Sequence, residues 1–134
     1  MLLGGERMPQ SPRTSKSPGL SHLRITLAEN FYLGPGRADL MELIAETGSI
    51  AAAGKRMGMS YKRAWGLVQA LNDGFGRSLI ETSRGGAAQG GAALTPVGSE
   101  VLRRYRQMQA ATREAIAGDV AALTALMTDM SQKK

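Results

Sequence analysis

The chain has 134 residues, enough for one domain with a substantial hydrophobic core, and its 43% hydrophobic content is ordinary for a globular protein. Its net charge of +6 at pH 7 favours a polyanionic partner such as nucleic acid or an anionic membrane. With no Cys and a single histidine, His22, the sequence excludes disulfides and the usual transition-metal sites, and no apolar run is long enough for a transmembrane helix. We therefore expect a cytoplasmic protein without a metal or other cofactor.

The first segment, residues 1–21, is rich in Pro, Ser and Gly. It holds too little apolar surface to order itself, so we expect a disordered leader. A basic arm that contacts DNA phosphates is the less favoured alternative. Residues His22–Leu27 then alternate apolar and polar side chains, which predicts a half-buried strand.

A first helix is predicted over Arg37–Glu46, after the chain breaker at 34–36. Its apolar stripe consists of Leu40, Leu43 and Ile44, flanked by Met41, and Asp39, Glu42 and Glu46 are left for solvent. Gly48 stands in the left-handed position that commonly follows a helix.

Residues Ser49–Phe75 predict two more helices joined by a tight turn at Gly58. Ser49 and Ser60 are expected to cap them. The shorter helix buries Ile50, Ala53 and Met57, and the longer one buries Ala64, Leu67, Val68, Leu71 and Phe75. A short helix, a glycine turn and a basic second helix are the parts of a helix-turn-helix DNA reader.

The window Thr47–Asn72 holds four basic residues and no acidic one. The longer helix is expected to present Lys62, Arg63, Gly66, Gln69 and Asp73 on the face opposite its core stripe. Basic side chains at its start can bond guanine acceptors in the major groove, and hydroxyl and backbone N–H groups there suit phosphate. Lys55 and Arg56 either contact phosphate or serve solubility alone.

Two short strands, Leu79–Thr82 and Ala92–Thr95, predict a β-hairpin wing that can reach the DNA backbone or the minor groove. The glycine-rich loop between them carries one cation, Arg84. It lacks the Gly-Lys-Ser/Thr sequence and the following helix of a phosphate-binding loop, so we reject a nucleotide site. We expect Trp65 to pack against the wing or the first helix rather than to stack on a base, because duplex DNA offers no unstacked base.

A C-terminal helical segment over 96–134 starts at the strong signal Thr95-Pro96. Its first stripe is Val97, Val101, Tyr105, Met108 and Thr112, with Arg103, Arg104 and Arg106 outside. Gly118-Asp119 is expected to interrupt or re-cap it, giving one helix or a pair. Val120, Leu123, Met127 and Met130 then have the spacing of a packed helix seam. We favour a homodimer interface over packing onto the chain's own domain, since a twofold reader gains a second half-site by pairing.

A family resemblance rests on four features in order: the run 33–72 with its MSYKRAW helix opening, the LIET strand, the glycine-rich GGAAQGGAALT wing, and a helix start at Gly98. Together they resemble the N-terminal DNA-binding domain of the ModE-type molybdate-responsive regulators, over roughly Leu23–Met108. The resemblance implies a LysR-like winged helix-turn-helix, mainly α with a small β-wing, that dimerises through flanking helices and reads a palindromic operator. It places Ser60, Tyr61, Lys62 and Arg63 in the major groove, and Arg84 with its neighbouring glycines at the wing tip.

Full-length regulators of that type also carry C-terminal molybdate-binding domains, whereas this chain ends with a helix. The resemblance therefore implies binding of double-stranded DNA but not of molybdate by this chain. The expected DNA contacts are Ser49, Lys55, Arg56, Ser60, Tyr61, Lys62, Arg63, Gln69, Arg84, Gly85 and Gly86. The expected dimer contacts are Val101, Tyr105, Met108, Leu123 and Met127.

The predicted organisation is a winged DNA-binding domain over 22–95 followed by the dimerisation segment 96–134. The predicted function is that of a sequence-specific transcriptional regulator. A protein-interaction module and a non-specific architectural DNA-binding protein are the alternatives. An enzyme is not expected, because we find no paired carboxylates, nucleophile–base set or metal cluster at usable spacing.

Overall fold

The computed structural model describes residues 17–83 and 90–132. The described residues fall into two units, one within Arg24–Gln107 and one made of residues 17–23 with 108–132. The expected leader lies outside the described residues over 1–16. No helix in the described ranges is long and apolar enough to cross a membrane.

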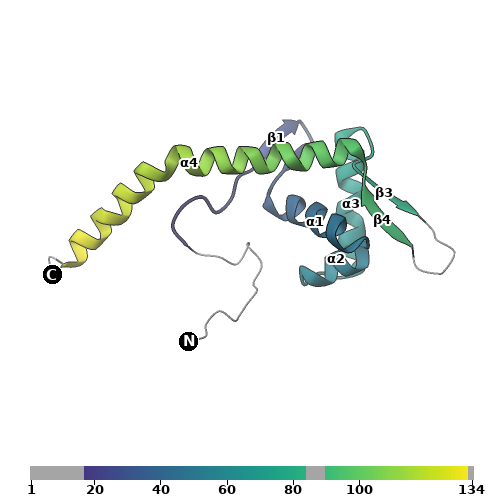
Figure 1. The fold of residues 1–134 in the computed structure, drawn as a ribbon, viewed down its shortest axis with the longest axis horizontal. Helices are drawn as coiled ribbons and strands as arrows, with labels where there is room; N and C mark the ends of the chain where they lie inside the picture. The colour runs from purple at the N-terminus through teal and green to yellow at the C-terminus, as the bar shows by residue number, and fades with distance from the viewer. Residues whose placement is uncertain (1–16, 84–89, 133–134) are drawn as a thin grey trace. The chain divides into compact units, whose positions relative to one another are not determined.

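The fold is mainly helical with a small β-wing, as predicted (Figure 1). The described residues also form a second small antiparallel sheet, which was not predicted. In chain order the elements are β1 (Ile25–Ala28), β2 (Phe31–Leu33), α1 (Pro35–Thr47), α2 (Ile50–Arg56), α3 (Tyr61–Phe75), β3 (Ile80–Ser83), β4 (Gly91–Leu94) and α4 (Pro96–Gln132). All of them up to the first part of α4 belong to the unit Arg24–Gln107.

The first hairpin differs from the sequence prediction. β1 begins at Ile25 rather than at His22, and it pairs with β2, a strand that the sequence analysis did not predict. The register shifts between Thr26 and Ala28. Such an irregularity breaks the alternation of side chains along a strand, and Leu27, on the predicted apolar side of the strand, is accordingly 52% exposed.

Helix α1 starts earlier than predicted. Gly34 occupies the extended N-cap position and Pro35 the first turn, so the Gly-Pro-Gly sequence begins the helix. Met41, predicted only to flank the stripe, is fully buried together with Leu40 and Ile44. Gly48 ends the helix with a left-handed φ of 73°, as predicted.

An ion-pair cluster joins α1 to the first part of α4. It shows that two sequence predictions, a solvent-facing Asp39 and an outward-pointing Arg106, are wrong. Asp39 is only 8% exposed instead of facing solvent, and Arg106 does not point outward. Arg106 Nη2 donates to Asp39 Oδ1 at 2.9 Å and to Glu42 Oε1 at 2.7 Å. Burial alone would lower the pKa of Arg106, but the hydrogen bonds and charges of the two carboxylates raise it, so the guanidinium stays charged.

The hydrophobic core of this unit draws on β2, on helices α1 to α3, on both wing strands and on the start of α4. Its largest fully buried side chains are Tyr105, Leu40, Met41, Ile44, Leu71, Leu79, Ile80 and Val68. Small residues bring α2 and α3 into close contact. A Cβ on Gly54 would lie 2.8 Å from the Cβ of Ala64, closer than carbon atoms can pack.

Helix α4 is a single continuous helix, which confirms the one-helix alternative, and Gly118-Asp119 does not interrupt it. One interior glycine costs only about 1 kcal/mol relative to alanine, too little to end a long helix. The predicted start is confirmed, because the Thr95 hydroxyl accepts a hydrogen bond from Gly98 N at 2.9 Å.

Candidate nucleic-acid interface

The helix-turn-helix is built by two serine caps, as predicted. Ser49 Oγ accepts a hydrogen bond from Ala52 N at 3.0 Å, and Ser60 Oγ accepts one from Arg63 N at 3.1 Å. Gly58 in the intervening turn has a φ of 74°, which an L side chain rarely adopts. These local contacts fix where α3 begins and which of its residues stand in its first turn.

The outer face of α3 is exposed because the opposite face is buried. Ala64, Val68 and Leu71 are at most 1% exposed. The face that the sequence predicted for solvent consists of Lys62, Arg63, Gly66, Gln69 and Asp73, and all five are exposed. The first turn of α3 therefore presents its hydroxyl and basic groups outward.

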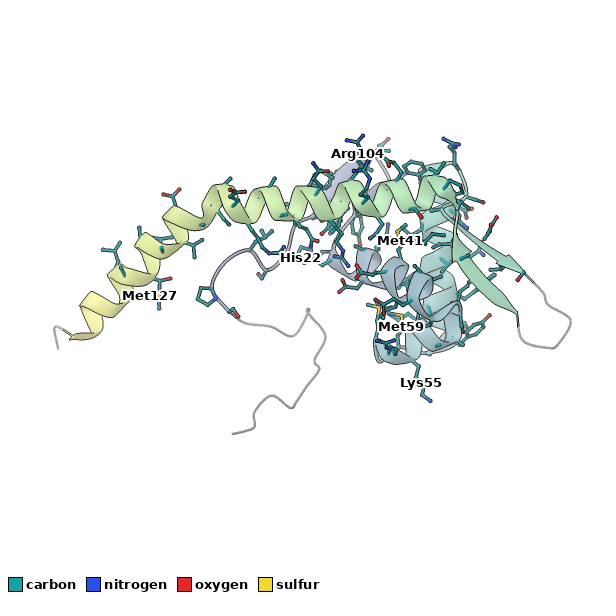
Figure 2. All side chains as sticks on the ribbon, in the orientation of Figure 1. His22, Met41, Lys55, Met59, Arg104 and Met127 are labelled. Atoms are coloured by element: carbon teal, nitrogen blue, oxygen red, sulfur yellow. The ribbon has the colours of Figure 1, made fainter. Side chains whose placement is uncertain are left out.

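The four cations of the acid-free window differ in their surroundings. Arg56 Nη2 lies 3.8 Å from Glu46 Oε1 in an exposed ion pair. Such a pair contributes little to stability in water. Lys55 projects away from α2 into solvent (Figure 2). Among residues 17–83 and 90–132, no ion pair engages Lys55, Lys62 or Arg63. Their charge is thus available to an external anion.

The wing is fastened to α3 by Asn72, which the sequence analysis did not single out. Its side chain accepts hydrogen bonds from Leu79 N at 2.8 Å and Ile80 N at 3.1 Å, and donates to Ile80 O at 3.0 Å. The sequence signal that could have indicated this role is an amide side chain beside the core stripe, in the last turns of a helix that precedes a strand. Asn72 thereby ties the start of the wing to α3.

The predicted wing strands pair antiparallel, with bounds shifted by one residue, as β3 and β4. A hydrogen bond of 2.9 Å from Ala92 N to Gly48 O ties β4 to the turn between α1 and α2. Thr95 N donates to Leu79 O at 2.9 Å and closes the base of the hairpin. The expected wing-tip residues Arg84, Gly85 and Gly86 lie outside the described residues.

Two aromatic side chains stand in the first turns of α3. Tyr61 and Trp65 are stacked, with ring centroids 6.5 Å apart and an interplanar angle of 21°. Tyr61 is 57% exposed and Trp65 is 38% exposed. Trp65 stacks on a ring of its own helix, and the expectation that the rest of its surface packs against the wing or the first helix stays a prediction.

The expected dimer contacts fall into two groups. Tyr105 is 1% exposed and belongs to the core of the chain, whereas Val101 and Met108 are half-buried. Leu123 and Met127, farther along α4, are 62% and 71% exposed. Leu126, which was not predicted, is 58% exposed beside them.

The geometry defines a class of domain. Three helices, of which α2 and α3 are joined by a tight turn, and a β-hairpin anchored to α3 make a winged helix-turn-helix. Residues 38–99 match the family of bacterial regulatory helix-turn-helix proteins of the lysR type. These residues form a LysR-type helix-turn-helix domain.

Three of the most similar curated proteins are bacterial. The molybdenum-pterin-binding protein MopB of Rhodobacter capsulatus is 41% identical over 78 residues, which are 58% of this chain and 29% of MopB. The molybdenum transport protein ModE of Herbaspirillum seropedicae is 37% identical over 100 residues, 70% of this chain and 37% of that protein. The DNA-binding transcriptional dual regulator ModE of Escherichia coli K12 is 35% identical over 83 residues, which are 62% of this chain and 32% of that protein. The helix-turn-helix domain is therefore ModE-like, and the chain spans about a third of the length of these relatives.

A solved structure has the same fold. The CbnR DBD in the crystal structure of its complex with DNA superposes with a TM-score of 0.51 and 28% sequence identity. The likeness covers 67% of this chain and 95% of that one. It therefore takes in nearly the whole of a domain that was crystallised on DNA.

Proposed function

We propose that this chain binds duplex DNA sequence-specifically as a transcriptional regulator. The observation that carries the proposal is the first turn of α3, where Lys62 and Arg63 are exposed without an ion-pair partner in the described part of the chain. No acidic residue lies between Thr47 and Asn72 to oppose a polyanion. Both the ModE of Escherichia coli and the CbnR domain, which share this fold, are described as binding DNA.

In the proposed complex the start of α3 enters the major groove. Arg63 and Lys62 bond guanine acceptors, and Ser60 and Tyr61 offer hydroxyl groups. Phosphate contacts come from the α2 side through Ser49, Lys55 and Arg56, and from the wing tip, and Gln69 extends the reading face by another two turns of α3. A regulator of this kind acts where the DNA is, which we expect to be the cytoplasm.

The proposal includes a homodimer that reads a palindromic operator. Leu123, Leu126 and Met127 lie at helical spacing on one face of α4 and are each more than half exposed. A second copy of this helix would remove that apolar surface from water. Pairing also gives the twofold arrangement that places two recognition helices on successive half-sites.

Selection from a random duplex library, followed by gel shift of the enriched duplex against unrelated competitor DNA, tests the proposal. The expected result is a single enriched motif with twofold symmetry that resists competition at moderate salt. Binding with a steep salt dependence and no preference would instead identify an architectural protein. Failure to bind any duplex would refute DNA binding and leave a protein-interaction module.

A further inference from the structure

The stacked pair Tyr61–Trp65 is an exposed apolar ledge on a helix whose remaining outer surface is polar. Trp65 keeps 38% of its surface exposed although it stands next to the buried Ala64. The two rings stack at an interplanar angle of 21°, so together they form one apolar surface. These exposed aromatic rings lie next to basic side chains. The ligand that suits such a surface carries both an apolar group and negative charge.

The ledge lies on the side of α3 that faces the first wing strand. Tyr61, Trp65 and Asn72 occupy positions i, i+4 and i+11, which share one side of a helix. Asn72 holds Leu79 and Ile80 at the start of the wing. The ledge is therefore positioned between the outer face of α3 and the hairpin.

Polar side chains border the ledge on its solvent side. Lys62 precedes Trp65 by three positions and Gln69 follows it by four, so both are its neighbours on the helix surface. Lys62 would resist burial under an apolar protein surface, because an unpaired ammonium is costly to desolvate. A polyanion that itself carries apolar groups would both pair with the Lys62 ammonium and cover the aromatic rings.

Duplex DNA displays one apolar group in the major groove, the 5-methyl of thymine, next to the adenine N6 and N7 that a glutamine can bond. We propose that the Tyr61–Trp65 ledge contacts thymine methyl groups and that Gln69 bonds the adenine of the same or the adjacent pair. The ledge thereby gives the chain a preference for T·A pairs beside the bases read by Lys62 and Arg63. This inference rests on the proposed binding of duplex DNA through α3.

Uracil substitution isolates the methyl group. In the duplex selected by the unaltered chain, each thymine is replaced in turn by deoxyuridine, which keeps base pairing and removes only the methyl. Affinity should fall about fourfold at one or two positions, the effect of one buried methyl-sized group. In Trp65→Ala the ratio of thymine to uracil affinity at those positions should fall to about one, and in Tyr61→Ala it should fall toward one.

Leu27→Ala is the matched control, because Leu27 is 52% exposed on β1, outside the helix-turn-helix. It should keep the fourfold ratio. Tyr61→Ala, at an even more exposed position, serves as the test if Trp65→Ala does not fold by circular dichroism.

A fourfold ratio that persists in both α3 variants would overturn the proposal, as would a selected site that tolerates uracil at every thymine. So would an unchanged uracil ratio in Trp65→Ala together with altered self-association in sedimentation, which would make the ledge a protein contact. In each of these cases the unaltered chain still binds its selected duplex. Failure of the proposed function itself is distinct, because no duplex is then selected.

Discussion

Arg63 shows how one residue takes part in both the fold and the proposed function. Its backbone N–H donates to Ser60 Oγ and closes the cap of α3. Its guanidinium has no ion-pair partner in the described ranges. Because the cap uses only the backbone, the side chain can be changed without loosening the start of the helix.

Arg63→Ala should therefore weaken binding to the selected duplex by about 1–3 kcal/mol and relax the preference at one base pair, if Arg63 bonds guanine. Gel-shift titrations against a panel of single-base variants measure both effects. Arg113→Ala, at an exposed position of α4, is the control and should bind as the unaltered chain does. A loss that is equal on every duplex would assign Arg63 to phosphate instead.

Asn72→Ala should lower the free energy of unfolding by about 1–3 kcal/mol, because the buried backbone groups of Leu79 and Ile80 lose their partner. Urea denaturation at constant m-value measures the change. Asn72→Asp keeps an acceptor for both N–H groups but sets a carboxylate oxygen against Ile80 O in place of the donor, so it should not restore the stability of the unaltered chain. Equal stability of Asn72→Ala and the unaltered chain would show that the wing is held by other contacts.

At the scale of elements, the sequence predicted those helix ends that are determined by contacts between residues close together in the chain. Ser49 and Ser60 cap helices within three residues of themselves, and Gly48 ends a helix by its own φ. It could not predict the pairing of Arg106 with Asp39, which are 67 positions apart, because helical periodicity marks Asp39 only as polar. The β1–β2 hairpin was missed for a similar reason, since its register includes a shift that masks the period of two.

The same limits hold for the candidate site. The exposed face of α3 follows from one helix's periodicity and was predicted residue by residue. The anchoring of the wing by Asn72 depends on where β3 lies in space, which no spacing within α3 reveals. The exposed fraction of Trp65 likewise depends on how neighbouring elements pack around the side chain. The residue pattern within α3 cannot determine that packing.

The packing of α2 on α3 gives a prediction with a built-in control. Gly54→Ala should destabilise the fold by about 1–3 kcal/mol, because the new Cβ collides with Ala64. Gly66→Ala meets nothing within 4 Å on the exposed face of α3 and should raise stability by about 0.5–1 kcal/mol through helix propensity. Thermal and urea unfolding compare the pair. A stable Gly54→Ala variant would mean that α2 and α3 can separate without cost.

At the scale of the whole molecule, α4 contributes residues to both units of the chain. The first part of α4 contributes Tyr105 and Arg106 to the unit Arg24–Gln107. Its later part, beyond Gln107, carries Leu123, Leu126 and Met127 exposed. The proposed pairing surface and the proposed reading head are therefore carried by different parts of the same helix-linked chain.

Removal of the residues after Gly118 should therefore weaken self-association, and so should the double change Leu123→Gln and Met127→Gln, which keeps the helix. Glutamine is a good helix former, so the double variant tests the apolar face rather than the helix itself. Sedimentation velocity over a range of concentrations measures the dimer, and gel shift on a twofold site measures its use on DNA. Ala121→Gln, which alters an exposed position on the opposite side of the helix, should leave both unchanged. If the double variant sediments as the same dimer as the unaltered chain, the pairing surface lies elsewhere, because a contact built on these side chains cannot survive their replacement by polar groups.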